Sequence, residues 1–293
     1  MNILTLFATV VLAAETSFSA LVPTAGTKPA ISFADLSAAP HLQDETGVVL
    51  GTGTFSASIV AGEVAVNVTR VTKNSPMTIA FLGDSMVDTL GQDLREVRDA
   101  LKNIYPATSF TLLNFGVGGE NIVSGLARIL DGYTYLGKSH PSLISQHPDL
   151  IIVESFGYNP FPFEIGALEQ HWLSLAYIVD ALKANLPDSK IVIAATIAPN
   201  SRIFGDGAAG LAFSMTDKLQ RTQTIKSYLE NAVKFAKSQS LPLADAYHPS
   251  LDDFGDGREL YINPGDHIHY STEGRQFFTK VVVDTIIHNK LLE

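Results

Sequence analysis

Short, continuous apolar runs alternate with longer helical patterns from residue 77 onward, and this alternation leaves few folds open to the chain. The runs are rich in Ile, Val, Leu and Phe, as strands buried on both faces require. We predict strands at residues 77–82, 110–113, 150–153, 191–195 and 241–246. Apolar residues spaced alternately three and four apart predict helices at residues 94–104, 168–186, 225–236 and 278–286. Strands that alternate with helices imply right-handed crossovers, so we predict a three-layer α/β/α sandwich with a mainly parallel central sheet.

The length and composition of the chain are those of a globular protein. Its 293 residues, 46% of them hydrophobic, are enough to bury a full core. Thirty acidic against twenty basic residues give a formal charge of -10, which argues against nucleic acid as a partner and offers no attraction to anionic membranes. The absence of cysteine excludes disulfides, thiolate metal sites and a cysteine nucleophile.

The N-terminal part of the chain differs in character from the rest. Residues 1–20 begin with an apolar stretch that is too short to span a bilayer and ends in small residues. We interpret this segment as a signal peptide, with a buried apolar segment as the alternative. A signal predicts a secreted or extracytoplasmic protein without stable membrane insertion, whereas its absence predicts a cytoplasmic one. Residues 21–75 are interpreted as a linker with a small β extension, and residues 76–293 as the main domain.

Three polar motifs each follow a predicted strand by a few residues. Ser85 lies in Gly-Asp-Ser-Met, Gly119 closes Asn-Phe-Gly-Val-Gly-Gly, and Asn159 lies in Gly-Tyr-Asn. Alone, each motif is equally well explained as a turn or a cap. Ligands of open parallel sheets bind beyond the carboxyl ends of the strands, so the fold itself brings the three motifs to one edge. There they would supply a hydroxyl nucleophile and hydrogen-bond donors for an oxyanion.

Far downstream, Asp266 and His269 lie three positions apart in Asp-His-Ile-His. A serine hydroxyl is a poor nucleophile unless a base lies within hydrogen-bond reach and an acid orients that base. Asp266 and His269 can fill both roles from one turn. The spacing favours His269 over His267, although in an extended segment both rings would point the same way. We therefore predict a catalytic triad of Ser85, His269 and Asp266.

With these motifs in this order, the chain resembles the SGNH hydrolases, also called the GDSL esterase/lipase family, over roughly residues 77–288. The four sequence blocks of that family contribute Ser, Gly, Asn and His in turn. The matching positions here are Ser85, Gly119, Asn159 and His269. Pro160 departs from the family pattern, because it stands where an Asp usually follows the asparagine. The resemblance implies a flavodoxin-like SGNH hydrolase fold.

The resemblance also implies a serine-dependent hydrolase of carboxylic esters. In the implied mechanism His269 takes the proton of Ser85 as the hydroxyl attacks the ester carbonyl, and an acyl-enzyme forms. The backbone N–H groups of Ser85 and Gly119 and the side-chain amide of Asn159 would hold the oxyanion. No metal or organic cofactor is needed. The implied partners are small-molecule, glycan or lipid esters, and we prefer O-acetyl groups of glycans among them. The loops at residues 156–163 and 201–216 are candidates for the walls of the substrate site.

Two other functions are compatible with the sequence. One is a non-catalytic glycan-binding protein that retains the fold. The other is a metal-dependent hydrolase, because several carboxylates and imidazoles occur close together near the C-terminus. Its candidate ligands are Asp245, His248, Asp266, His267 and His269. The run at residues 252–257 is similar to a calcium loop, but Phe254 occupies a ligand position, so we interpret it as a polar turn.

Overall fold

The computed structural model describes the backbone of residues 48–50, 53–60 and 63–68 and the whole of residues 76–293. Residues 48–50, 53–60 and 63–68 form an antiparallel sheet of their own. Its strands are β1 (Val48–Leu50), β2 (Gly53–Val60) and β3 (Glu63–Val68), in the order β1-β2-β3. The predicted signal peptide at residues 1–20 lies outside the described residues and stays a prediction.

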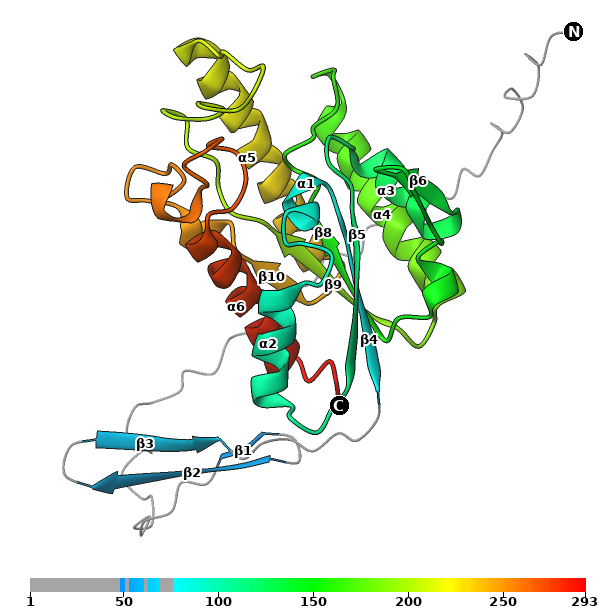
Figure 1. The fold of residues 1–293 in the computed structure, drawn as a ribbon, viewed down its shortest axis with the longest axis vertical. Helices are drawn as coiled ribbons and strands as arrows, with labels where there is room; N and C mark the ends of the chain where they lie inside the picture. The colour runs from blue at the N-terminus through cyan, green and yellow to red at the C-terminus, as the bar shows by residue number, and fades with distance from the viewer. Residues whose placement is uncertain (1–47, 51–52, 61–62, 69–75) are drawn as a thin grey trace, which may run out of the picture. The chain divides into compact units, whose positions relative to one another are not determined.

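A five-stranded parallel sheet forms the centre of the main domain, as the apolar runs predict (Figure 1). Its strands are β4 (Met77–Gly83), β5 (Phe110–Gly116), β8 (Leu150–Glu154), β9 (Lys190–Ala195) and β10 (Leu243–Asp245). Their order across the sheet is β10-β9-β8-β4-β5, and every neighbouring pair is parallel. The predicted α/β/α fold with a mainly parallel sheet is therefore confirmed.

Helices cover both faces of this sheet. The helices α2 (Arg95–Ile104) and α6 (Thr272–His288) contact each other over one face. Those over the other face are α3 (Ile122–Leu130), α4 (Ala167–Asn185) and α5 (Met215–Ser238) (Figure 1). Alternate strand residues enter opposite cores: Ile79 and Phe81 join the first, and Ala80 and Leu82 the second. No helix in the described ranges has both the length and the apolar content needed to cross a membrane.

Among the elements of the main domain that lack a predicted counterpart are a helix and a hairpin. The helix α3 carries a glycine and a serine within a short apolar pattern, which weakens its helical signal. The hairpin of β6 (Tyr133–Tyr135) and β7 (Lys138–His140) consists of strands that are too short and too polar to show a periodic pattern. Both lie between β5 and β8, beside the edge where the predicted site residues gather.

The carboxyl ends of β4 and of its two neighbours, β5 and β8, lie level with one another. Leu82 of β4 pairs with Phe115 of β5 on one side and with Val153 of β8 on the other. The chain leaves β4 toward β5 and then crosses back to β8, so the strand order reverses at β4. A reversal of this kind opens a crevice at the sheet edge, because successive connections run to opposite faces. The predicted site residues lie in the segments that follow these strand ends.

A buried histidine connects the second helical layer to this edge. His171 of α4 has no exposed surface, and its Nε2 lies 2.7 Å from the carbonyl oxygen of Ser155, directly after β8. Its Nδ1 lies 3.0 Å from the side-chain amide of Asn231 on α5, which donates to it. Burial lowers the pKa of His171 to about 4, because the charged imidazolium would lose its hydration. The neutral ring is therefore the form that the fold accommodates.

We predict that His171 makes the fold sensitive to acid. In the unfolded chain a histidine takes up its proton near its ordinary pKa of 6.5, whereas in the folded protein it does so only near 4. The unfolded state therefore binds more protons in this window, and stability falls as the pH drops through it, by roughly 3 kcal/mol in total. Denaturant unfolding at pH 7 and pH 4 measures this loss.

The matched control separates His171 from the other acid-sensitive groups. His171→Gln keeps a donor and an acceptor but does not titrate, so its stability should fall less between pH 7 and pH 4 than that of the unmodified protein. His288→Gln changes an exposed histidine at the end of α6 and should retain the full loss. Equal losses in all three proteins would show that the buried ring does not carry the effect.

Candidate active site

Ser85 begins a short helix directly after the first strand of the sheet. This helix, α1 (Ser85–Asp88), is capped by Asp84, whose Oδ1 accepts the backbone N–H of Met86 at 2.8 Å. The cap turns the chain sharply out of β4 and leaves Ser85 partly exposed at the sheet edge. Within the described part of the chain, neither the hydroxyl nor the backbone N–H of Ser85 has a hydrogen-bond partner. The N–H is free because the first turn of a helix has no internal acceptor.

The end of β5 passes very close to α1. A Cβ atom on Gly116 would lie 2.2 Å from the backbone nitrogen of Asp88, so only glycine fits there. Asn114, two residues earlier, donates its side-chain amide to the carbonyl oxygens of Val87 at 3.0 Å and Gly91 at 2.9 Å. The asparagine of this motif is thus a brace that holds α1 against the sheet.

Two glycines follow β5, and the first of them lies beside Ser85. A Cβ atom on Gly118 would lie 4.0 Å from the Cβ of Ser85, and the N–H of Gly118 donates to the hydroxyl of Tyr135 at 3.1 Å. That hydroxyl donates in turn to Asp88 at 2.7 Å. Gly119 has a φ of +76°, and its N–H has no acceptor in the described part of the chain. The Tyr135 hydroxyl thus pairs with the N–H of Gly118, whereas the N–H of Gly119 remains available to another acceptor.

Asn159 is joined to the strand end that carries Ser85. Its side-chain amide donates to Oδ2 of Asp84 at 3.0 Å, which links the segment after β8 to the segment after β4. Its backbone N–H bonds the carbonyl oxygen of Phe156 at 3.3 Å, so Asn159 sits in a tight turn that Pro160 follows. One amide N–H serves Asp84, and the second remains for another acceptor.

Two carboxyl groups are completely buried behind Ser85, and the sequence motifs gave no sign of the second. Asp84 and Glu154 both have no exposed surface. Burial raises the pKa of Asp84, against the opposing effects of its hydrogen bonds and of the positive charges on His269 and Arg128. Burial and the neighbouring Asp84 charge raise the pKa of Glu154 well above its ordinary value. Glu154 at the end of an otherwise apolar strand is the signal that could have found it.

Asp266 and His269 form a hydrogen-bonded pair. His269 Nδ1 lies 2.9 Å from Oδ2 of Asp266 and donates to it, because a carboxylate can only accept. Partial burial acts to raise the pKa of Asp266, but this bond and the N–H groups of Ile268 and His269 hold the pKa below its ordinary value. His269 Nε2 has no hydrogen-bond partner in the described part of the chain, so it remains able to accept a proton.

His267 does not share the surroundings of His269. The two rings would point the same way only in an extended segment, whereas His267 has a φ of +51°. Its Nδ1 donates to the carbonyl oxygen of Asp206 at 2.6 Å. Because of this positive φ the segment is not extended, so the condition for parallel rings is not met, and His267 bonds the loop of residues 201–214 at Asp206 instead.

The chain contains a second Asp-x-x-His pair, which sequence spacing alone does not distinguish from the first. His248 Nδ1 lies 2.7 Å from Asp245, at the end of β10, and its Nε2 lies 3.1 Å from Glu230 of α5. Both ring nitrogens therefore face carboxylates, and neither is left to take a proton from a nucleophile. This contact with Glu230 is what separates the two pairs chemically.

The structure does not support a metal centre formed from these residues. Asp245 and His248 form one pair, Asp266 and His269 form another, and His267 bonds a backbone carbonyl. Across the described ranges, no three His, Asp or Glu side chains gather as ligands of a metal would. The proposed five-residue cluster is therefore wrong.

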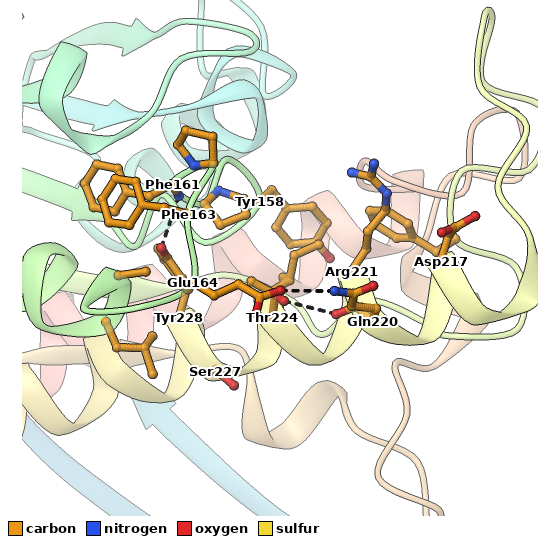
Figure 2. A pocket seen from close by; sticks show the side chains of 16 residues that line it. Tyr158, Phe161, Phe163, Glu164, Asp217, Gln220, Arg221, Thr224, Ser227 and Tyr228 are labelled. Atoms are coloured by element: carbon orange, nitrogen blue, oxygen red, sulfur yellow. Dashed lines mark hydrogen bonds between the residues drawn. The ribbon is translucent and has the colours of Figure 1, made fainter.

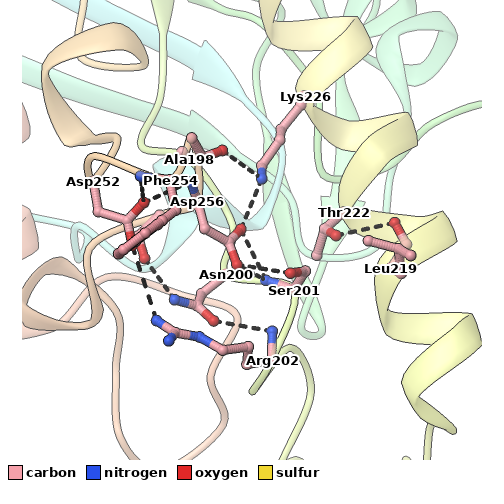
Figure 3. A network of polar contacts seen from close by, with 12 residues as sticks. Ala198, Asn200, Ser201, Arg202, Leu219, Thr222, Lys226, Asp252, Phe254 and Asp256 are labelled. Atoms are coloured by element: carbon pink, nitrogen blue, oxygen red, sulfur yellow. Dashed lines mark hydrogen bonds and ion pairs between the residues drawn. The ribbon is translucent and has the colours of Figure 1, made fainter.

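The run at residues 252–257 is a polar turn, held by a network of contacts (Figure 3). Asp252 Oδ1 accepts the N–H groups of Phe254 and Asp256, both at 2.9 Å. Asp256 accepts the hydroxyl of Ser201 and the ammonium of Lys226, each at 2.7 Å. The carboxylates thus face protein donors, and the turn ties residues 201–202 to α5.

A groove opens next to Asn159, between residues 158–164 and α5 (Figure 2). Its volume is about 520 Å³, within the range of small-molecule sites. Phe204 lines it from residues 201–216, so both predicted loops contribute to its wall. The walls carry aromatic rings on the loop side and polar side chains on the helix side.

The described fold and motifs agree with what comparison with known proteins finds. Residues 81–277 match the GDSL-like lipase/acylhydrolase family. A lipase/acylhydrolase from Enterococcus faecalis has a similar structure, with a TM-score of 0.54 at 15% identity, covering 73% of this chain and 96% of that one. A GDSL-like lipase from Bacteroides thetaiotaomicron gives 0.51 at 16% identity, covering 73% and 89%. No curated protein matches the chain in sequence.

At 15% and 16% identity, the two similar structures are evidence for the fold alone. The family match applies to the whole catalytic domain. It spans more than half of the chain and includes the segments after β4, β5 and β8 as well as Asp266 and His269. The protein therefore belongs to the GDSL-like lipase/acylhydrolase family and is a hydrolase of ester bonds.

Proposed function

We propose that the protein is a serine esterase in which Ser85 is the nucleophile, His269 the general base and Asp266 the residue that orients it. The observation that carries this proposal is the pair of Asp266 and His269. Asp266 fixes the proton on Nδ1, so Nε2 keeps the lone pair that a base requires. The coulombic effect of His269 on Asp84, the residue before Ser85, supports its proximity to the nucleophile.

Three donors are suited to hold the oxyanion. The N–H groups of Ser85 and Gly119 have no acceptor in the described part of the chain, and Asn159 has one amide N–H beyond the bond to Asp84. Such donors stabilise the negative charge that develops on the carbonyl oxygen, and they cost little reorganisation because the fold already holds them. Asp84 is the positioning residue for Asn159.

The reaction proceeds in two halves. The Oγ of Ser85 attacks the ester carbonyl carbon while His269 Nε2 takes its proton, which gives a tetrahedral oxyanion. The imidazolium then donates that proton to the departing alcohol oxygen, the carbon–oxygen bond breaks, and an acyl-serine remains. Water attacks the acyl group with His269 again as base, and the carboxylic acid and free Ser85 are released. As substrates we propose short acyl esters, O-acetyl groups of glycans foremost.

Replacing Ser85 by Ala should lower turnover of p-nitrophenyl acetate by about a thousandfold or more, because the covalent route is lost. The unfolding transition should be unchanged, since the hydroxyl makes no contact in the described part of the chain. A fluorophosphonate probe should label the unmodified protein and not the variant. Retained turnover in the variant would refute the nucleophile assignment, and a chelator should leave the activity of the unmodified protein intact.

The two Asp-x-x-His pairs provide a matched comparison. His269→Ala should lower kcat by about a thousandfold or more, because it removes the proposed general base. His248→Ala removes the same ring from a pair of similar geometry and should lower kcat less than about threefold, since both of its nitrogens already face carboxylates. Steady-state kinetics on p-nitrophenyl acetate measure both. If His248→Ala causes the larger loss, the base has been assigned to the wrong pair.

Asn159→Ala should lower kcat on the order of a hundredfold with little change in KM, because an oxyanion donor acts chiefly in the transition state. The change also removes the bond to Asp84, so the unfolding free energy is measured alongside. Asn185→Ala, on the exposed end of α4, is the control for loss of an asparagine. A raised KM with kcat intact would make Asn159 a binding or bracing residue instead.

A further inference from the structure

The groove beside Asn159 has two chemically different walls. On the loop side, the rings of Phe161 and Phe163 stack at 5.2 Å between centroids, and Phe163 is 48% exposed (Figure 2). Tyr158 and Phe204 extend this wall, with their ring centroids 6.4 Å apart. Flat rings of this kind offer broad apolar faces.

Helix α5 forms the opposite wall mainly with polar side chains, together with Ile225 and Tyr228. Gln220, Arg221 and Thr224 follow one another at spacings of one and three residues and all line the groove. Gln220 donates to Glu164 across the groove at 3.2 Å (Figure 2). Arg221 lies 4.2 Å from the ring of Phe213, which holds it in place, and it makes no hydrogen bond in the described part of the chain. This wall therefore presents both donors and acceptors.

The polar wall favours a sugar over an acyl chain as the occupant of the groove. An acyl chain would cover the N–H groups of Arg221 without giving them partners, and a polar group that is buried without a partner is costly. A pyranose ring has an apolar C–H face that can lie on an aromatic ring and hydroxyls around its edge that can bond the polar wall. The groove carries two carboxylates, Glu164 and Asp217, and one guanidinium, Arg221, so it does not favour a negatively charged sugar.

The position of the groove relates it to the ester that the enzyme attacks. Tyr158 and Pro160 line the groove, and Asn159 between them bonds Asp84, the residue before Ser85. A ligand in the groove therefore lies against the same short segment that supplies the proposed oxyanion donor. Under the proposed function the acyl group becomes bonded to Ser85, which leaves the alcohol part of the substrate to reach the groove.

We infer that the groove between residues 158–164 and α5 is a sugar-binding subsite, which holds a pyranose ring of the alcohol part of a glycan ester. The aromatic face of Phe163 stacks on the ring, while Gln220 and Arg221 bond its hydroxyls. This inference rests on the proposed function for the identity of the reacting ester, but the binding of sugar in the groove does not require turnover.

Calorimetric titration of the Ser85→Ala protein with unacetylated xylotetraose and chitotetraose tests binding apart from catalysis. We expect at least one of the two to bind, and Phe163→Ala in the same background to weaken that binding by tenfold or more. Gln220→Ala should weaken it by threefold or more, because the polar wall loses its amide. Binding of neither sugar, or binding that both changes leave intact, overturns the inference.

Two controls match these variants. Phe254 is 91% exposed in the polar turn and does not line the groove, so Phe254→Ala removes a similar phenyl without effect on sugar binding. Gln223→Ala removes an exposed amide one residue from Thr224, outside the groove lining. Thermal unfolding of all four variants excludes loss of folding as the cause of weaker binding.

Esters of different chain length test the opposing assignment. With Ser85 restored, Phe163→Ala should raise KM for an acetylated xylotetraose by fivefold or more. If it instead raises KM for p-nitrophenyl octanoate more than for the acetylated sugar, the groove is an acyl site and the inference fails. Loss of the proposed function would appear differently, as turnover retained in Ser85→Ala, and would leave a Phe163-dependent sugar affinity in place.

Discussion

The buried carboxylate of Asp84 holds together the two strand ends on which the proposed site depends. It accepts the N–H of Met86, which starts α1, and the amide of Asn159, which follows β8. A carboxylate without exposed surface is costly unless hydrogen bonds replace its hydration, so the two segments are fixed to it rather than merely near it. Ser85 and Asn159 take their relative positions from this one group.

A second buried carboxyl beneath Asp84 limits the charge that the site can carry. Glu154 accepts the hydroxyl of Ser155 at 2.6 Å and the N–H of Phe156 at 2.8 Å, and it lies within 3.5 Å of the Asp84 nitrogen. Two adjacent buried carboxylates repel each other, and burial together with the Asp84 charge raises the pKa of Glu154. The arrangement therefore disfavours negative charge on both carboxyls at once. Asp84 and Glu154 both lie at the sheet edge. Glu154 therefore also helps to hold the segment that carries Asn159, through its bond with the N–H of Phe156.

The sequence predicted the sheet and the edge of the site better than the contacts within it. The runs that became β4 and β8 are apolar on both faces, and parallel strands of that kind leave their carboxyl ends at one edge. Tyr135 was missed because its hairpin is too short for a periodic pattern. Spacing alone also left two Asp-x-x-His pairs equivalent. Tertiary contacts, which have no local signature, distinguish the two pairs. Glu230 reaches His248 from a distant helix, whereas the charge of His269 acts on Asp84, the residue before Ser85.

The proposed oxyanion donor and the groove wall belong to one continuous segment, and this has a consequence for specificity. Pro160 fixes its own φ and restricts the residue before it, so the position of Asn159 depends on how residues 160–163 lie. Those residues are held from α5, where the hydroxyl of Tyr228 accepts the N–H of Phe161 at 3.1 Å. A sugar that packs on Phe163 would therefore contact the same segment that positions the side-chain amide of Asn159. Under the proposed function, changes at residues 160–163 would therefore affect transition-state stabilisation as well as binding of the alcohol, because one segment carries the donor and the groove wall.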